Sequence, residues 1–144
     1  MRMILLAPLA LALSPAAAVA APGGSTITVA VAGIGAAEGK VHVDICPEAS
    51  FLQPDCGYSG EAQAVAGTTV VTVANVPPGR YASAAYWDAN GNGKADRNLI
   101  GLPIEQVGFS NDVRVKMSKP KFADCAFTHA AAPQKIGFAI HKIP

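Results

Sequence analysis

The sequence has few charged and few aromatic residues, and it has no long apolar pattern at helical spacing. Charged residues make up 15% and aromatic residues 6% of its 144 residues. Eleven Lys and Arg against ten Asp and Glu leave a formal net charge of +1, which excludes a nucleic-acid binder that works through bulk positive charge. Fourteen Gly and eleven Pro favour short strands joined by turns. A chain of this length allows one domain.

The longest apolar run opens the chain. Arg2 precedes an apolar run at residues 3–13, and Ala18 and Ala20 are small residues at the positions that a signal peptidase reads. The run is shorter than the roughly 20 residues needed to span a bilayer. We therefore predict a signal peptide over residues 1–20, cleaved after about Ala20, and a periplasmic or secreted protein. Loss of Arg2 takes the eleven basic residues to ten, which equals the ten acidic residues.

The rest of the chain alternates with period two. Such alternation is typical of strands with one buried face, and it occurs at residues 26–31, 40–45, 68–73, 80–87, 113–117 and 134–141. Turn signals separate these runs, including the VPPG sequence at 76–79. We predict an all-β protein: one antiparallel two-sheet β-sandwich of the Ig-like or prealbumin-like kind, with about seven strands, as a single domain over residues 21–144.

Three cysteines cannot all pair within one chain. Cys46 and Cys56 bracket the turn-rich segment 47–55, and we predict that they form a disulfide. Cys125 is then a free thiol, which the alternation at residues 122–127 places on the same side as Phe127, as a buried and inert residue. Its neighbour His129 leaves a Cys/His nucleophile or metal pair as the alternative.

The segment DANGNGKAD at residues 88–96 has oxygen-bearing side chains at its first, third, fifth and ninth positions and glycine at its sixth. This spacing is that of a loop that wraps a hard cation, and we predict weak calcium binding, with Kd about 10⁻⁴–10⁻³ M. The twelfth position is Leu99 and not the Glu of an EF-hand. The alternative is an ordinary Asn-Gly turn. The predicted ligands are Asp88, Asn90, Asn92, the carbonyl of Lys94, Asp96 and, from the next loop, Glu105.

A second charged segment lies at residues 114–121. Its four cations are a candidate contact for an anionic partner such as an envelope glycan or lipid surface, and the alternative is a solvated strand edge. They are Arg114, Lys116, Lys119 and Lys121.

Motifs of known enzyme classes are absent from the sequence. It has no Gly-x-Ser-x-Gly, no His-Glu-x-x-His and no phosphate-binding loop. His42 and His141 have no orienting group at a fixed spacing, so we expect both to be solvated. We therefore expect no enzymatic activity. The alternative is a small periplasmic hydrolase that uses the acidic residues of the 88–105 region.

Five motifs in order resemble the DUF2141 family of exported bacterial proteins: VPPGRYA at 76–82, DANGNGKAD at 88–96, GLPIE at 101–105, GFSN at 108–111 and PKFAD at 120–124. The resemblance implies a prealbumin-like or carboxypeptidase-regulatory-like β-sandwich without an established activity. Many relatives read His-Asp at the start of the acidic loop, whereas this chain reads Trp87-Asp88. Together these features predict a monomeric binding or structural accessory module of the cell envelope. Its partner would be a glycan or protein, not a nucleic acid, and it would not span the membrane.

Overall fold

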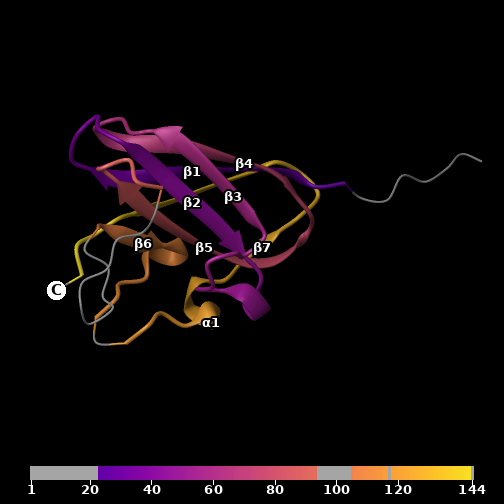
Figure 1. Ribbon diagram of the computed structural model, residues 1–144. Helices are drawn as coiled ribbons and strands as arrows, with labels where there is room; N and C mark the ends of the chain where they lie inside the picture. The colour runs from indigo at the N-terminus through magenta and orange to yellow at the C-terminus, as the bar shows by residue number, and fades with distance from the viewer. Residues whose placement is uncertain (1–22, 94–104, 117, 144) are drawn as a thin grey trace, which may run out of the picture.

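The computed structural model describes residues 23–93, 105–116 and 118–143, so the predicted signal peptide lies outside the described residues. Within the described part the chain forms eight strands, two 3-10 turns and one short helix (Figure 1). The elements in chain order are β1 (Ser25–Ile34), β2 (Lys40–Cys46), η1 (Glu48–Ser50), β3 (Tyr58–Gln63), β4 (Gly67–Val76), β5 (Gly79–Asp88), β6 (Val107–Phe109), η2 (Ser110–Asp112), α1 (Phe122–Cys125), β7 (Phe127–His129) and β8 (Gln134–Ala139).

The strands form two sheets that pack face to face. The smaller sheet has the order β4-β1-β8, and the larger has the order β3-β2-β5-β6, with β7 paired to the Gly79 end of β5. The predicted all-β sandwich is confirmed. One strand pair differs from the antiparallel expectation, because β1 and β8 run parallel. Alternation reports which side chains are buried and carries no information on the direction of the neighbouring strand.

The main core fills the space between the two sheets. It is built largely from β-branched residues at every second position of β1, β2 and β4. Such side chains are stiff and pack well on a pleated surface, so they favour these strands as well as filling the core. At most 1% of each of the following is exposed: Ile27, Val29, Val31, Val41, Val43, Ile45, Val71 and Val73.

A second apolar cluster, here called the outer cluster, covers the other face of β5. Its buried members are Ala82, Phe109, Phe122 and Cys125. Phe51, which follows η1, meets the rings of Phe109 and Phe122 edge to face, with centroid distances of 6.2 and 5.8 Å. This geometry is favourable for aromatic pairs. Short turns and loops therefore cover the larger sheet on its outer side, as the placement of α1 below β5 shows (Figure 1).

One predicted strand was wrong, and the alternation at residues 122–127 comes largely from a helical turn. Residues 113–116 are not in a strand, although Val113 and Val115 pack against the outer cluster while Arg114 and Lys116 are exposed. Alternating burial here comes from a loop lying on a hydrophobic surface. The segment that begins at Phe122 is a helical turn, which places Phe122 and Cys125 on one face at a spacing of three residues. The predicted burial of Cys125 is nevertheless confirmed.

Three strands, β3, β6 and β7, were not predicted from the sequence. β3 has only half-buried or exposed residues, and β6 and β7 have three residues each, so none has a clear apolar signal. Among the helices in the described part of the chain, none is long and apolar enough to cross a membrane.

Candidate functional site

The chain that follows β5 is wrapped around the carboxylate of Asp88. Asp88 is only 4% exposed. Its Oδ1 accepts the backbone N–H of Asn92 at 3.2 Å, and its Oδ2 accepts that of Gly93 at 2.7 Å. Oδ1 of Asn90 also lies 3.2 Å from the N–H of Asn92. Gly91 and Gly93 have φ values of 69° and 74°, which glycine adopts without strain. One carboxylate thus organises the first half of this loop.

The structure describes only part of the predicted cation loop. Asp88, Asn90 and Asn92 belong to its first half, whereas Lys94 and Asp96 lie outside the described residues. Glu105, where the described chain resumes, is half-buried. Within residues 23–93, 105–116 and 118–143, no group of three or more His, Cys, Asp or Glu side chains is placed to hold a metal ion.

Tyr86 marks where the acidic side chains converge. Burial, followed by the negative charges of Asp44, Asp88, Glu105 and Glu61, raises the pKa of Tyr86 to about 12. Asp44 comes from β2, Glu61 from β3 and Asp88 from the end of β5. Carboxylates from three neighbouring strands and from Glu105 therefore act electrostatically on one phenol.

His42 lies among the same carboxylates. Its Nε2 is 2.8 Å from Oδ1 of Asp44, and its Nδ1 is 3.2 Å from Oε1 of Glu61. The hydrogen bond to Asp44 is the main cause that raises the pKa of His42, with a smaller contribution from Glu61, and burial opposes it. The ring also packs against Tyr86 at a centroid distance of 5.0 Å. His42 was expected to be solvated; instead it is a partly buried imidazole with a carboxylate at each nitrogen.

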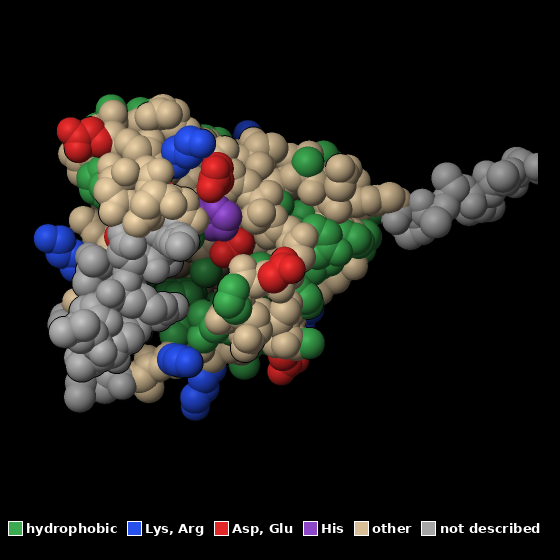
Figure 2. All heavy atoms as spheres, in the orientation of Figure 1, with side chains coloured by type: hydrophobic (Ala, Val, Ile, Leu, Met, Phe, Trp, Pro, Cys, Tyr) green, Lys and Arg blue, Asp and Glu red, His purple; other side chains and the backbone are tan. Residues whose placement is uncertain are grey.

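We call this set of residues the acidic patch: His42, Asp44, Glu61, Tyr86, Asp88 and Glu105. In the space-filling view, a histidine lies between acidic side chains, beside a hollow with an apolar floor (Figure 2). The alternation of β2 and β5 could have placed His42, Asp44 and Tyr86 on one face, but the sequence gave no sign that β3 would add Glu61.

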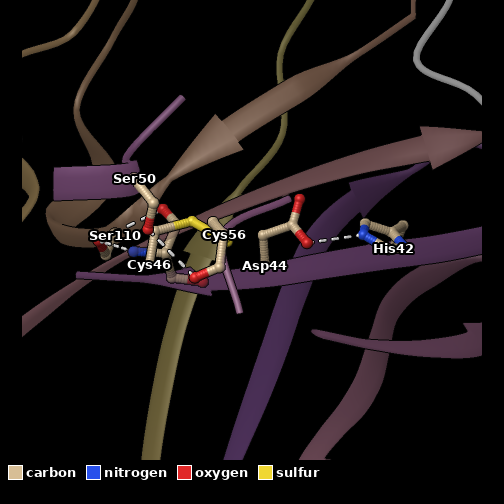
Figure 3. The surroundings of a disulfide bond; sticks show 7 residues. His42, Asp44, Cys46, Ser50, Cys56 and Ser110 are labelled. Atoms are coloured by element: carbon tan, nitrogen blue, oxygen red, sulfur yellow. Dashed lines mark hydrogen bonds and ion pairs between the residues drawn. A yellow bond between two sulfur atoms is a disulfide. The ribbon is translucent and has the colours of Figure 1, made fainter. Parts of the chain in front are cut away.

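The predicted disulfide between Cys46 and Cys56 is confirmed. Cys46 ends β2, two residues after Asp44, so the bridge lies next to the acidic patch (Figure 3). Ser50 donates a hydrogen bond from its Oγ to the carbonyl of Cys56 at 3.2 Å, within the loop that the bridge closes. The disulfide therefore holds the segment that carries Phe51 over the outer cluster.

The free cysteine and its histidine neighbour do not form a pair. Burial, followed by the charge of Asp124, raises the pKa of Cys125 to about 11, so its sulfur remains a thiol at neutral pH. The imidazole of His129 meets other residues: Nε2 lies 2.8 Å from Oγ of Ser25, and Nδ1 lies 2.7 Å from Oε1 of Gln134. The predicted alternative of a Cys/His nucleophile therefore lacks its central contact.

The contacts of His129 were missed by the sequence analysis. Gln134 donates from Nε2 to the carbonyl of Thr128 at 3.2 Å, and its Oε1 lies 2.7 Å from Nδ1 of the ring. Nε2 of the ring lies 2.8 Å from Oγ of Ser25, whose hydroxyl donates to the carbonyl of Ala132 at 3.2 Å. The buried imidazole links β1 of the smaller sheet to β7. Ser25 lies 104 positions away from His129, and no local motif indicates such a contact.

The four cations of the predicted basic segment lie in different surroundings. Arg114 and Lys116 lie in the loop after η2 and line a groove that Lys142 also lines. Lys119 and Lys121 are exposed but do not line it. His141, expected to be solvated, is half-buried, with Nε2 3.9 Å from Oδ1 of Asp112.

Comparison with protein-family profiles shows to which family the chain belongs. The profile of the family described as uncharacterized protein conserved in bacteria (DUF2141) matches residues 29–137. The chain belongs to the DUF2141 family. Neither the curated proteins nor the solved structures contain a match to it.

The DUF2141 motifs of this chain fasten its loops to one another. Ser110, from GFSN, accepts the N–H of Ser83 and donates its hydroxyl to the carbonyl of Cys125. Asn111 donates from Nδ2 to the carbonyls of Asp124 and Ala126 at 3.1 and 3.0 Å. The GFSN segment thus holds the helical turn of the PKFAD segment against β5.

Two further DUF2141 motifs also have a structural role. In VPPGRYA, the hydroxyl of Tyr81 donates to the carbonyl of Pro77 at 2.8 Å and so fixes the turn between β4 and β5. In DANGNGKAD, the carboxylate of Asp88 holds the start of the acidic loop, as described above. The GFSN glycine, Gly108, lies against the C-terminal strand, where a Cβ would lie 2.3 Å from the carbonyl oxygen of Ala139.

Proposed function

We propose that this DUF2141 protein is an exported, non-enzymatic binding module of the cell envelope, and that its acidic loop holds one calcium ion. The partner would be an envelope glycan or protein that meets the acidic patch beside this loop. The proposal rests mainly on the way in which the loop closes around Asp88.

The loop geometry supports a cation site. The N–H groups that Asp88 accepts belong to Asn92 and Gly93, the fifth and sixth positions when Asp88 is the first. This closure turns the loop back on itself, and loops of this oxygen-rich spacing surround calcium. The proposed ligands are side-chain oxygens of Asp88, Asn90, Asn92, Asp96 and Glu105 and the carbonyl of Lys94.

Local charge supports the same proposal. The carboxylates of Asp44, Glu61, Asp88 and Glu105 all act on Tyr86, so a negative potential extends from the end of β5 across the larger sheet. A divalent cation would lower the mutual repulsion of these groups. Four of the ten acidic residues of the chain thus act on the region where a cation would bind.

Export is supported by the disulfide. Disulfides persist in oxidising compartments such as the bacterial periplasm and are rare in the cytosol. The bridge between Cys46 and Cys56 agrees with the signal peptide predicted over residues 1–20.

The proposed absence of catalysis is supported by the hydrogen bonds and the burial of the reactive side chains. Both oxygens of Asp88 accept backbone N–H groups, and both nitrogens of His129 are hydrogen-bonded. The thiol of Cys125 is buried and protonated. Each of these groups holds a loop or strand in place.

Thermal unfolding in calcium and in chelator tests the proposal. At a calcium concentration ten times the Kd, a site present only in the native state adds about 1.4 kcal/mol, which should raise the unfolding midpoint by several degrees. Because the expected Kd is about 10⁻⁴–10⁻³ M, calcium at about 10 mM is compared with EGTA. Fluorescence of the single Trp, Trp87, which adjoins Asp88, gives a second signal.

Matched variants locate the effect. Asp88→Asn removes one carboxylate of the loop and should abolish the calcium-dependent rise in the midpoint, whatever its own effect on stability. Asp55→Asn removes an exposed carboxylate from the disulfide loop and should leave the rise intact. Equal midpoints of the unmodified protein in calcium and in EGTA would overturn the calcium proposal.

A further inference from the structure

A groove lies beside β6, and none of its described lining residues belongs to the acidic patch. β6 ends the sheet, and its Val107 exchanges two backbone hydrogen bonds with His141, at 3.0 and 2.8 Å. This contact brings the last described residues beside the loop that follows η2. Between them the groove has a volume of about 260 Å³. Three separate parts of the chain therefore form its walls.

The groove has an apolar floor. Phe109 is a buried member of the outer cluster, and the valines pack against that cluster while keeping part of their surface exposed. The apolar lining consists of Val107, Phe109, Val113, Val115 and Ile143. Because these side chains are held by a packed cluster, the floor is formed before any ligand binds.

The rim of the groove carries positive charge. Arg114, Lys116 and Lys142 line it, and all three are exposed. No carboxylate in the described part of the chain forms an ion pair with any of the three. Oδ1 of Asp112, which precedes this loop, lies 3.9 Å from Nε2 of His141. Asp112 forms no ion pair with any of the three cations.

We propose that the groove binds a medium-chain fatty acid, with its carboxylate at the three cations and its alkyl chain on the apolar floor. The positive rim favours an anionic head, and the apolar floor favours a tail without polar groups. A volume of about 260 Å³ accommodates about nine groups of the size of water, about 30 Å³ each, which is the bulk of an eight- to ten-carbon acid. This site is separate from the acidic loop and does not need calcium.

Calorimetric titration of the full exported protein with a series of sodium salts tests the proposal. Hexanoate, octanoate and decanoate should bind with one-to-one stoichiometry, each added methylene tightening binding by up to about fourfold. The titrations are run in EGTA, so that loss of the calcium site leaves the result unchanged. Decyltrimethylammonium, which has the same tail and the opposite charge, should bind at least tenfold more weakly than decanoate.

Variants on the rim provide the matched control. Lys116→Gln with Lys142→Gln should weaken decanoate binding at least tenfold, because two of the three rim charges are lost. Lys119→Gln with Lys121→Gln removes the same charge from neighbouring positions that do not line the groove, and it should leave the affinity unchanged. All four positions are exposed, so these variants should fold like the unmodified protein.

Three results would overturn the proposal. One is an absence of saturable decanoate binding at millimolar concentration. Another is binding of inorganic phosphate as tight as that of decanoate, which would indicate a site for anions alone. The third is an equal effect of the two double variants, which would indicate attraction by surface charge without use of the groove.

Discussion

The two faces of the larger sheet differ in the structure that covers them. On the inner face, β2 contributes Val41, Val43 and Ile45, all fully buried in the main core. On the outer face the same strand carries His42 and Asp44, and neighbouring β5 carries residues of the outer cluster. The inner face is closed by another sheet, whereas the outer face is closed in part by loops. Sheet packing thus provides the scaffold, and the loops decide which part of the outer face remains available for binding.

The largest expected contrast between the faces lies in two adjacent residues of β2. Ile45→Ala leaves a cavity in the main core and should lower the free energy of unfolding by about 2–5 kcal/mol. Asp44→Ala removes one carboxylate beside His42 and should change it by about 1 kcal/mol or less, since its side chain is 29% exposed. Urea unfolding measures both. Equal losses would mean that the outer face contributes to stability as much as the core does.

The disulfide gives the next largest effect, and it acts on the outer face. Replacement of Cys46 and Cys56 by Ala should lower the free energy of unfolding by about 2–3 kcal/mol, because the bridge closes a short loop in the unfolded chain. It should also loosen Phe51 over the outer cluster, so that iodoacetamide labels Cys125 faster in the native protein. In the unmodified protein Cys125 should be labelled only after denaturation. If iodoacetamide labels Cys125 no faster in the double variant, the disulfide does not contribute to the packing of the outer cluster.

The smallest expected effect is the pH dependence of His42. Its pKa is raised in the folded protein, so its ion pairs stabilise the native state fully below the ordinary histidine pKa of about 6.5. This stabilisation should be lost as the pH rises through the raised pKa. Because the side chains of its partners Asp44 and Glu61 are 29% and 44% exposed, the change should be about 1 kcal/mol or less. NMR titration of the ring protons measures the pKa directly, and His42→Gln should remove this part of the pH dependence of unfolding. A pKa at or below 6.5 would contradict the contacts described.

The inner face could be predicted from the sequence because it follows from alternation. Strands β1, β2, β4, β5 and β8 were predicted to within a few residues at their ends. The same rule failed at residues 113–116, where alternation comes from a loop that lies on the outer cluster. Apolar residues at every second position indicate alternating burial. A loop that lies on an apolar surface can produce this pattern as well as a strand.

The candidate site could be predicted only in part, for a related reason. Asp88, Asn90 and Asn92 are close in sequence, so their spacing indicated a loop organised by oxygens. The contacts of Asp44 and Glu61 with His42 depend on the register of β2 and β3, and β3 has no apolar signal. The contact of Ser25 with His129 joins segments 104 positions apart, and Arg114 and Lys142 line one groove although they are distant in sequence. Such contacts follow from topology, which residue patterns do not encode locally.

The parallel pairing of β1 and β8 has a consequence for the order of assembly. β1 is the first strand in the described part of the chain and lies at the centre of its sheet, where one neighbour is β8, the last described strand. A chain that emerges from a ribosome or a membrane pore with its N-terminus first can pair β1 with β4 early, yet that sheet stays incomplete until residues 134–139 have followed. Completion of the fold therefore waits for the end of the chain, and a protein cut short before β8 would expose one whole side of β1 to other unfinished chains.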